Sequence, residues 1–475
     1  MTVDFKRTKI VCTIGPASRD EATLRAMIRA GMDVARINFS HGSHEHHQRD
    51  IAAIRRIAEE EGRVVAVMAD LQGPKLRIGS IEPGPIELNR YDRVEFTSRP
   101  ATGAGGVINL PHPDLIAEVH VGETLYLDDG ALELLVVEKA DDTLICNVVV
   151  GGALSSNKGI AAPETNLTLS AITEKDERDA AFALAQGVDY LALSFVRARR
   201  DIEQLRAMLN DLDGDVAIVA KIEKREAVKA FDDILDATDA VMVARGDLGV
   251  EISVQEVPLR QKEIIRKCNR VGKPVITATQ MLQSMIENPR PTRAEASDVA
   301  NAILDGTDAV MLSGETAVGV YPVRAVEMMA QIADITEKTL PSRNDQVSFG
   351  EVEHLHPVAD AISRATCEIA DDLDVRLIVT STWSGYTARQ VAKERPGKPI
   401  VAVTPNPIAQ RRTALVWGVL PMLVEQYKNT DDMLEMMEQT VRSCGLAEPG
   451  DSFVVTGGLP FGGGGMTNFV KVHQL

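Results

Sequence analysis

The sequence is poor in cysteine and lacks any spacing typical of a disulfide framework or a structural zinc site. Five cysteines are scattered over 475 residues without a C-x-x-C pair, which indicates a reducing compartment. The chain shows no secretory segment at Met1, and no uncharged apolar run reaches the roughly 20 residues needed to cross a bilayer. We therefore expect a soluble cytoplasmic protein that does not enter a membrane.

Positive charge is scarce as well. Lys and Arg together number 51, against 69 Asp and Glu residues, which gives a net charge of −18. Such a balance disfavours nonspecific binding to nucleic acid or to anionic membranes. The phosphate-binding pattern G-x-x-x-x-G-K-[ST] is missing, because both Gly-Lys pairs run into proline. A nucleotide of the ATP type would have to be held by a metal ion and by locally placed Lys and Arg side chains.

The sequence does contain a long alternation of apolar strand-like runs and amphipathic helical stretches. Its length predicts two or three domains. Strands are expected at residues 9–14, 33–39, 63–70, 188–195, 216–221, 240–245, 274–279 and 309–313. Eight successive strand–helix units are typical of a (β/α)8 TIM barrel. After the third strand, short alternating strands separated by Gly, Pro and Asp turns predict an inserted β domain.

A third region follows an expected linker at residues 341–345. Helices expected at 358–373 and 386–394, and strands expected at 376–380, 400–403 and 452–456, predict an α/β domain. We therefore divide the chain into a barrel (1–70 and 171–338), an inserted small β-barrel-like lid (71–170) and a C-terminal α/β domain (339–475).

Two strand ends carry paired charges. Lys221 and Glu223 follow the run 216–220, and Arg245 and Asp247 follow the run 240–244. Ligands bind at the carboxyl ends of parallel strands, and two carboxylates without a nearby His or Cys favour Mg²⁺ or Mn²⁺. The alternatives are helix-start residues, surface ion pairs and a simple salt bridge between Lys221 and Glu223.

The second strand ends in residues that suit a phosphate and a weakly held cation. Arg36 offers a planar fork to phosphate oxygens, and Asn38 and Ser40 supply neutral oxygens. The nearby segment His44-Glu45-His46-His47 lacks the H-E-x-x-H spacing of a metal helix. We interpret it as a solvated helix start.

The third strand closes with Asp70 and opens the insertion. Gly73-Pro74 is a plausible hinge, beyond which Lys75 and Arg77 could swing over the barrel mouth. Ordinary surface charges beside a turn are the alternative.

Hydroxyl groups in segments 277–280 and 313–316 could orient a carboxylate or relay a proton, or could cap the helices that follow.

In combination these segments resemble the pyruvate kinase family, from about residue 9 to the C-terminus. The matching segments are 36–42, Asp70 with Gly73-Pro74, 221–223, 244–249, 278–282 and 313–317. The resemblance implies transfer of the phosphoryl group of phosphoenolpyruvate to ADP, which gives pyruvate and ATP. It also implies a homotetramer whose interfaces transmit the binding of an effector.

The resemblance assigns roles to individual residues. Glu223 and Asp247 would bind magnesium, and Lys221 would stabilise the transferring phosphoryl group and the enolate. Arg36 and Arg77 would hold phosphate oxygens, and Thr279 would lie beside the carbon that is protonated. The substrate carboxylate would lie at the backbone of Gly246, Asp247 and Thr279. The nucleotide would lie near Asn38, His41, Arg77 and Lys175.

One departure from the family concerns a monovalent cation. Potassium-activated members resemble Thr-Lys-Gly-Pro-Glu after the aspartate of the third strand, whereas this chain has Leu71-Gln72-Gly73-Pro74-Lys75. Lys75 would bring a covalently attached positive charge to the region where potassium otherwise binds. The region implied comprises Asn38, Ser40, Asp70, Leu71 and Lys75. We therefore predict activity without potassium.

The resemblance also points to an effector site in the C-terminal domain. Segment 380–387 places hydroxyl groups between an expected strand and an expected helix, as in an anion site. Its candidate ligands are Ser381, Thr382, Ser384, Gly385 and Thr387, with Gly462–Gly465 as a covering loop. The covering segment 458–461 lacks a basic residue, so we expect a sugar monophosphate or AMP rather than fructose 1,6-bisphosphate.

Two other classes of protein remain open from the residues alone. A magnesium-dependent lyase acting on pyruvate enolate would use the same paired carboxylates, but it would need neither the lid cations nor a second phosphate site. A catalytically silent metabolite-binding protein would have lost residues such as Arg36, Lys221, Glu223 or Asp247, and all four are present.

Overall fold

A closed barrel of eight parallel strands forms the centre of the molecule. The computed structural model describes residues 6–168, 170–340, 356–460 and 466–475. The strands run around the barrel in the order β1-β16-β15-β14-β13-β12-β3-β2. Their bounds are β1 (Lys9–Ile14), β2 (Val34–Asn38), β3 (Ala66–Asp70), β12 (Tyr190–Leu193), β13 (Ala217–Ile222), β14 (Ala240–Ala244), β15 (Val275–Ala278) and β16 (Ala309–Leu312). The predicted barrel is confirmed, and the insertion leaves after its third strand.

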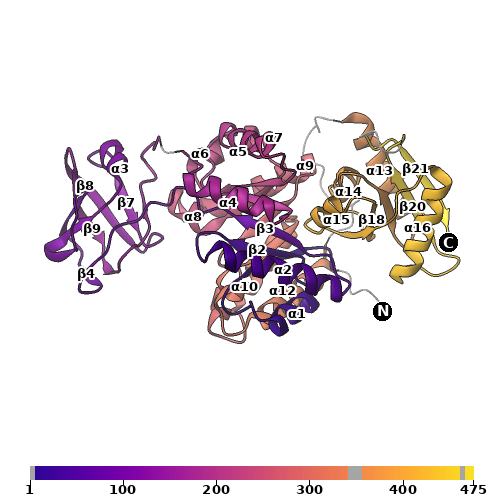
Figure 1. Ribbon diagram of the computed structural model, residues 1–475, viewed down its shortest axis with the longest axis horizontal. Helices are drawn as coiled ribbons and strands as arrows, with labels where there is room; N and C mark the ends of the chain where they lie inside the picture. Colours follow the sequence, from indigo (N-terminus) through magenta and orange to yellow (C-terminus); the bar gives the residue numbers. More distant parts are fainter. Residues whose placement is uncertain (1–5, 169, 341–355, 461–465) are drawn as a thin grey trace.

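The helices lie around this barrel (Figure 1). They are α1 (Glu21–Ala30), α2 (His44–Glu60), α4 (Glu174–Ala185), α5 (Arg199–Asp211), α6 (Arg225–Lys229), α7 (Phe231–Ala237), α8 (Arg245–Glu251), α9 (Val257–Val271), α10 (Arg293–Leu304), α11 (Gly314–Ala317) and α12 (Pro322–Glu337). Short 3-10 turns precede α9 (η2, Val254–Glu256) and α10 (η3, Gln283–Ile286). Two short helices, α6 and α7, connect the fifth and sixth strands.

Alternation along each strand builds the inside of the barrel. Side chains at every second position point to the same face of a strand. Val34, Met68, Tyr190 and Val219 pack together in one cluster inside the barrel, whereas their neighbours in sequence pack outward against the helices. The inward series of β13 continues to Lys221. The sequence suggested that Lys221 follows the apolar run of this strand, but the structure places it within the strand.

The insertion forms a separate body at one end of the molecule (Figure 1). It consists of a six-stranded sheet in the order β11-β7-β8-β9-β5-β6 and a two-stranded sheet, β10-β4, around its own apolar core. Its elements are β4 (Ile86–Leu88), β5 (Arg93–Thr97), η1 (Ala104–Gly106), β6 (Val107–Asn109), α3 (Pro113–Glu118), β7 (Thr124–Leu127), β8 (Leu132–Ala140), β9 (Thr143–Val150), β10 (Gly152–Leu154) and β11 (Ile160–Ala161).

The C-terminal body is a five-stranded sheet with helices, in the strand order β19-β18-β17-β20-β21. Its elements are α13 (Pro357–Asp372), β17 (Ile378–Ser381), α14 (Tyr386–Ala392), β18 (Ile400–Thr404), α15 (Pro407–Thr413), β19 (Val419–Leu423), α16 (Thr430–Cys444), β20 (Ser452–Gly457) and β21 (Phe469–Gln474). The sequence did not reveal β19, β21, α15 or α16. The linker expected at 341–345 and the glycines 462–465 lie outside the described residues.

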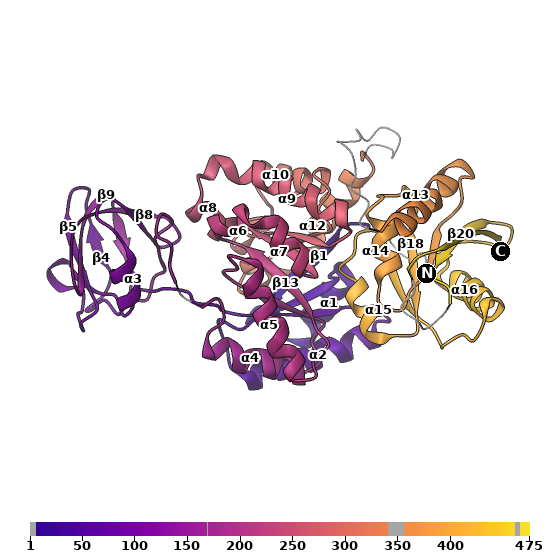
Figure 2. The ribbon, with the colours of Figure 1, turned by 90° about the horizontal axis from the view of Figure 1, so that it is seen from above.

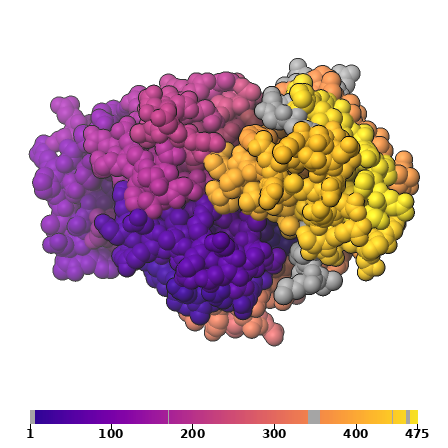
Figure 3. Space-filling view, turned by 45° about the vertical axis from the view of Figure 1, so that its right-hand side comes forward, coloured from indigo at the N-terminus to yellow at the C-terminus, as the bar shows by residue number. Residues whose placement is uncertain are grey.

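The C-terminal body covers the amino ends of the barrel strands, opposite the insertion (Figure 2). Ala414 and Leu415 join the apolar cluster inside the barrel. Arg411 forms an ion pair with Asp189 at 2.7 Å, just before β12. The space-filling view shows the C-terminal body in close contact with the barrel (Figure 3). The carboxyl ends of the strands are left facing the insertion.

Across the described ranges, no helix is both long and apolar enough to cross a membrane.

Candidate active site

Lys221 is the centre of a buried polar layer at the carboxyl end of the barrel. Its ammonium group lies 2.8 Å from Glu223 Oε1 and 3.2 Å from Asp70 Oδ1, and donates to Ser194 Oγ at 2.7 Å. Burial alone would lower the pKa of Lys221, but the two carboxylates raise it above its ordinary value. The lysine is therefore held charged, next to the strand ends.

Arg36 belongs to the same layer. Its Nε donates to Asp70 Oδ2 at 2.6 Å, and its Nη1 donates to Thr13 Oγ1 at 2.9 Å. Burial would raise the pKa of Asp70, but Arg36 and Lys221 hold it below its ordinary value. Asp70 is therefore an ionised bridge between two cations. Breaking either pair would leave a buried charge uncompensated.

Glu223 and Asp247 follow the neighbouring strands β13 and β14, and both line one pocket. Glu223 is 1 % exposed, and its Oε2 accepts from the backbone N–H of Phe195 at 2.7 Å. Burial and the charge of Asp247 raise the pKa of Glu223, although Lys221 opposes them. Asp247 lies in α8 and is more exposed than Glu223. Two carboxylates that disfavour each other's charge suit a divalent cation that fills its remaining positions with water and substrate oxygens.

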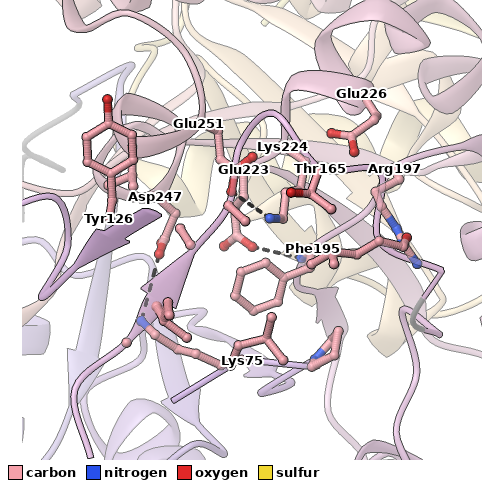
Figure 4. A pocket seen from close by; sticks show the side chains of 18 of the residues that line it. Lys75, Tyr126, Thr165, Phe195, Arg197, Glu223, Lys224, Glu226, Asp247 and Glu251 are labelled. Atoms are coloured by element: carbon pink, nitrogen blue, oxygen red, sulfur yellow. Dashed lines mark hydrogen bonds and ion pairs between the residues drawn. The ribbon is translucent and has the colours of Figure 1, made fainter. Parts of the chain in front are cut away.

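Lys75 approaches this pocket from the insertion (Figure 4). Its Nζ lies 3.8 Å from Asp247 Oδ1 and 3.9 Å from Asp129 Oδ1. The ring of Phe195 lies between Lys75 and Lys224 in this view, and Lys224 is paired with Glu251 at 2.5 Å. The barrel and the insertion thus both contribute charged groups to one pocket of about 80 Å³.

Thr279 is held by the first turn of α8, which directly follows β14. The hydroxyl of Thr279 accepts from Gly246 N at 2.7 Å and donates to Ala278 O at 2.6 Å. Arg245 donates to the carbonyl of Thr279 at 2.8 Å and pairs with Asp298 at 2.7 Å. Arg245 is therefore occupied in holding the backbone of Thr279. The hydroxyl of Ser313, considered as a cap, makes no capping bond to α11.

Three of the residues expected near the nucleotide, Asn38, His41 and Lys175, lie near the carboxyl end of β2, which β3 separates from β12. Lys175 donates to the carbonyl of Phe39 at 2.7 Å and pairs with Asp179 at 2.5 Å. Asn38 Oδ1 accepts from Ser40 N at 3.1 Å, and His41 is exposed. The structure therefore brings Lys175 beside the segment that carries Asn38, Ser40 and His41.

Arg77 is not brought to this centre. Its guanidinium group donates to the carbonyl of Asn157 at 2.8 Å, and its backbone pairs with Gly159 inside the insertion. It does not line the pocket that contains Lys75 and Asp247. A role in phosphate binding requires the insertion to move relative to the barrel.

The histidine segment at the start of α2 is only partly solvated. His44 pairs with Asp179 at 2.8 Å and stacks on Phe182 with ring centroids 4.1 Å apart. His47 is buried against Phe39, and burial lowers its pKa to about 4. Within the ranges that the structure describes, no three His, Cys, Asp or Glu side chains form a metal cluster.

Sequence reasoning missed Ser194, Phe195 and Thr13. Each contacts a residue that it did select, namely Lys221, Glu223 or Arg36. The inward series Tyr190, Ala192, Ser194 could have identified the serine once the register of β12 was known.

A second pocket, of about 770 Å³, lies in the C-terminal body. Its lining includes Ser381, Thr382, Ser384 and Thr387 together with Arg389, Lys428 and the side chains of Trp383, Tyr386 and Tyr427. Ser381 and Tyr427 are hydrogen-bonded to each other. Gly385 begins α14 with a φ of 81°. The predicted effector segment therefore lines a cavity with two basic groups.

Comparison with known proteins identifies the family. The family model for the pyruvate kinase barrel domain matches residues 5–326, and that for the pyruvate kinase alpha/beta domain matches residues 360–473. A pyruvate kinase of Geobacillus stearothermophilus is 49 % identical over 473 residues, which cover 99 % of this chain and 80 % of the relative. Pyruvate kinase 2 of Synechocystis is 45 % identical over 475 residues, covering 99 % and 79 %. The chain therefore belongs to the pyruvate kinase family and is a phosphotransferase.

Proposed function

We propose that this protein transfers the phosphoryl group of phosphoenolpyruvate to ADP at the carboxyl end of the barrel. The observation that carries the proposal is the buried layer in which Lys221 is held charged between Asp70 and Glu223, beside the pocket that contains Asp247. A fixed cation stabilises charge on a transferring phosphoryl group without reorganising during the reaction. Lys221 is assigned this role.

The other residues hold and orient the substrates. Arg36 is assigned to phosphate oxygens, and the backbone of Gly246 and Asp247 to the carboxylate of the substrate. The hydroxyl of Thr279 is assigned to the side on which carbon is protonated. Arg77 joins the phosphate oxygens when the insertion closes, and Asn38, His41 and Lys175 lie on the nucleotide side.

Glu223 and Asp247 are assigned as the ligands of Mg²⁺ or Mn²⁺. Burial and, to a smaller extent, the charge of Asp247 raise the pKa of Glu223, and the positive charge of a bound dication would oppose both effects. When bound, such an ion polarises phosphoryl and enol oxygens. Both carboxylates are oxygen donors, as a hard cation requires.

We assign Lys75 as the replacement for a monovalent cation. Its Nζ already lies 3.8 Å from Asp247, and Asp70 and Leu71 precede it on the same connecting segment. The test compares the turnover rate in a tetramethylammonium buffer with that in a potassium buffer, both free of sodium. Comparable rates support the assignment. A loss of more than about tenfold without potassium, about 1.4 kcal/mol in barrier, contradicts it.

Control by a phosphorylated metabolite is proposed for the C-terminal pocket. Arg389 and Lys428 supply positive charge beside the hydroxyl groups of segment 381–387. Activation titrations with glucose 6-phosphate, ribose 5-phosphate, AMP and fructose 1,6-bisphosphate identify the ligand, and we expect a monophosphate. The proposal also includes a homotetramer in the cytoplasm. Light scattering would measure the mass of this assembly.

A coupled assay tests the reaction itself. With phosphoenolpyruvate, ADP and Mg²⁺, pyruvate formation is followed through lactate dehydrogenase. Lys221→Ala is expected to lose about 10³-fold or more in kcat, whereas Lys229→Ala, on an exposed turn of α6, should leave it unchanged. Pyruvate formation that needs no ADP would indicate the lyase, and no turnover at all would indicate a silent binding protein.

A further inference from the structure

The hydroxyl group of Ser194 connects Lys221 to a backbone carbonyl. Ser194 follows β12 and is 2 % exposed. Its Oγ accepts from Lys221 Nζ at 2.7 Å and donates to Leu71 O at 2.7 Å. Asp70 Oδ1 is farther from Ser194 Oγ, at 3.4 Å. A serine hydroxyl has one proton to donate and lone pairs to accept, so the bond to Leu71 directs a lone pair at the lysine.

Ser194 completes the coordination of the ammonium group. A lysine has three N–H donors, and three acceptors surround Lys221: Asp70 Oδ1, Glu223 Oε1 and Ser194 Oγ. The two carboxylates have other partners, because Asp70 also holds Arg36 and Glu223 also accepts from Phe195. Ser194 is the neutral member of the three, and a carbonyl that cannot titrate fixes its orientation.

The position of Ser194 is itself fixed from both sides. Tyr190 and Ala192 precede it on the inward face of β12, and β12 pairs with β13 so that Leu193 lies opposite Ala220. On the other side, a Cβ placed on Gly73 would lie 3.1 Å from Ser194 Cβ and 2.7 Å from the Phe195 ring. The connector to the insertion therefore packs directly on Ser194.

The Ser194 side chain is 2 % exposed, and its hydroxyl group donates its proton to Leu71 O and accepts from Lys221. We infer that Ser194 is a positioning residue of the phosphoryl-transfer reaction: it fixes the ammonium group of Lys221 and does not itself contact the substrate. This inference rests on the proposed function, in which Lys221 is catalytic.

The test is a double-mutant cycle with Ser194→Ala and Lys221→Ala. If Ser194 acts only through Lys221 in the transition state, removing its hydroxyl group lowers kcat and leaves the KM values unchanged. Ser194→Ala is expected to lower kcat about 10- to 100-fold, as a misplaced catalytic group does, with both KM values within about threefold. In the Lys221→Ala background the same change should lower the residual kcat by less than twofold. Ser194→Thr, which keeps the hydroxyl group, should recover most of the lost rate.

Thr238→Val is a matched control. The Thr238 hydroxyl is equally buried and bonds to Ile218 O and Ala240 O at the amino end of the barrel, away from Lys221. It should change the unfolding midpoint but not kcat. An unchanged kcat in Ser194→Ala, or an equal loss with and without Lys221, would overturn the inference. Wild-type turnover in Lys221→Ala would instead overturn the proposed function, and the role of Ser194 with it.

Discussion

Thr279 has a backbone conformation that β-branched residues rarely adopt. Its φ is 68°, and Gln280 follows with a φ of 57°. Such positions cost about 1–3 kcal/mol each and persist where the surroundings hold them. Here three hydrogen bonds do so, two at the hydroxyl of Thr279 and one from Arg245 to its carbonyl.

This geometry separates the roles of the methyl and hydroxyl groups of Thr279. Thr279→Val keeps the branching but leaves Gly246 N without an acceptor, so we expect a loss of about 1–3 kcal/mol in stability and a fall of at least tenfold in kcat/KM. Thr279→Ser keeps both bonds and removes the crowding methyl group. It should be at least as stable as the wild type and keep most of its activity. Urea unfolding and the coupled assay measure both; a valine variant as active as the serine variant would contradict the assignment.

Lys75 brings a positive charge within 3.8 Å of Asp247. Lys75→Glu places a carboxylate near Asp247 and leaves the cation region without its attached positive charge. We expect turnover without potassium to fall by more than about tenfold, and added potassium to restore part of it. Lys158→Glu makes the same charge reversal within the insertion, where Lys158 pairs with Asp128 at 2.7 Å. Equal potassium responses in the two variants would refute the role of Lys75.

At the scale of elements, the two connectors of the insertion meet at one buried carboxylate. Asp176, in the first turn of α4, is fully buried. Its Oδ1 accepts from Gly73 N at 3.0 Å on the outgoing connector. Its Oδ2 accepts from Thr173 N at 2.9 Å and from Thr173 Oγ1 at 2.6 Å on the returning one. The helix cap of α4 therefore also ties the hinge of the insertion.

Asp176→Asn should loosen this hinge. An amide nitrogen cannot accept, so one connector loses its bond, with an expected cost of about 1–3 kcal/mol. Hydrogen exchange should speed up in peptides covering residues 71–76 and 171–176. Asp201→Asn is the matched control, because Asp201 caps α5 by accepting from Arg197 N at 2.8 Å and Ala198 N at 3.1 Å. Both bonds go to Oδ2, so the amide oxygen of asparagine can keep them, and this variant should change neither the stability nor the exchange of the connectors. Unchanged exchange at Gly73 in Asp176→Asn would contradict this reading of the hinge.

Elements with strong periodicity were predictable from sequence, and those fixed by tertiary contact were not. The bounds expected for the first strand, residues 9–14, match β1 in the structure, since it is a continuous apolar run. The edge strands β19 and β21 escaped prediction because they are only partly buried, so that their apolar pattern is weak. In the site, the charged residues at strand ends could be predicted because charged side chains directly follow apolar runs. Ser194 could not, because its contact with Lys221 depends on the register between β12 and β13. The position of Arg77 depends on how the insertion sits, which no local pattern encodes.

The barrel interior is polar at its carboxyl end and, apart from Lys9, mainly apolar at its amino end. The inward positions run from Ala217 and Val219 to Lys221 on β13, and from Ala66 and Met68 to Asp70 on β3. The apolar end is closed by Leu415 of the C-terminal body. The C-terminal body thus completes the barrel core, because Ala414 and Leu415 pack inside it. Whether a ligand in the C-terminal pocket changes the activity of the site is tested by the effector titrations.

Lys9 is a buried cation at this closed end, and it predicts a pH dependence of stability. Its Nζ donates to Val419 O at 2.7 Å, and burial lowers its pKa from 10.5 to about 8. Below pH 8 both the folded and unfolded chains hold this proton, so the cost of burying the charge is fully present. Between pH 8 and 10.5 the unfolded chain binds more protons, so the contribution of Lys9 to stability rises with pH, by at most about 3 kcal/mol.

Lys9→Met isolates this contribution, because methionine has a similar length and no proton to release. The free energy of unfolding of the wild type, relative to Lys9→Met, should increase between pH 7.5 and 10. The loss of the bond to Val419 O shifts the variant by an amount that does not depend on pH, so the slope carries the information. Lys229→Met, at an exposed position of α6, should run parallel to the wild type over the same range. Parallel curves for Lys9→Met as well would show that Lys9 keeps an ordinary pKa and that water reaches the closed end of the barrel.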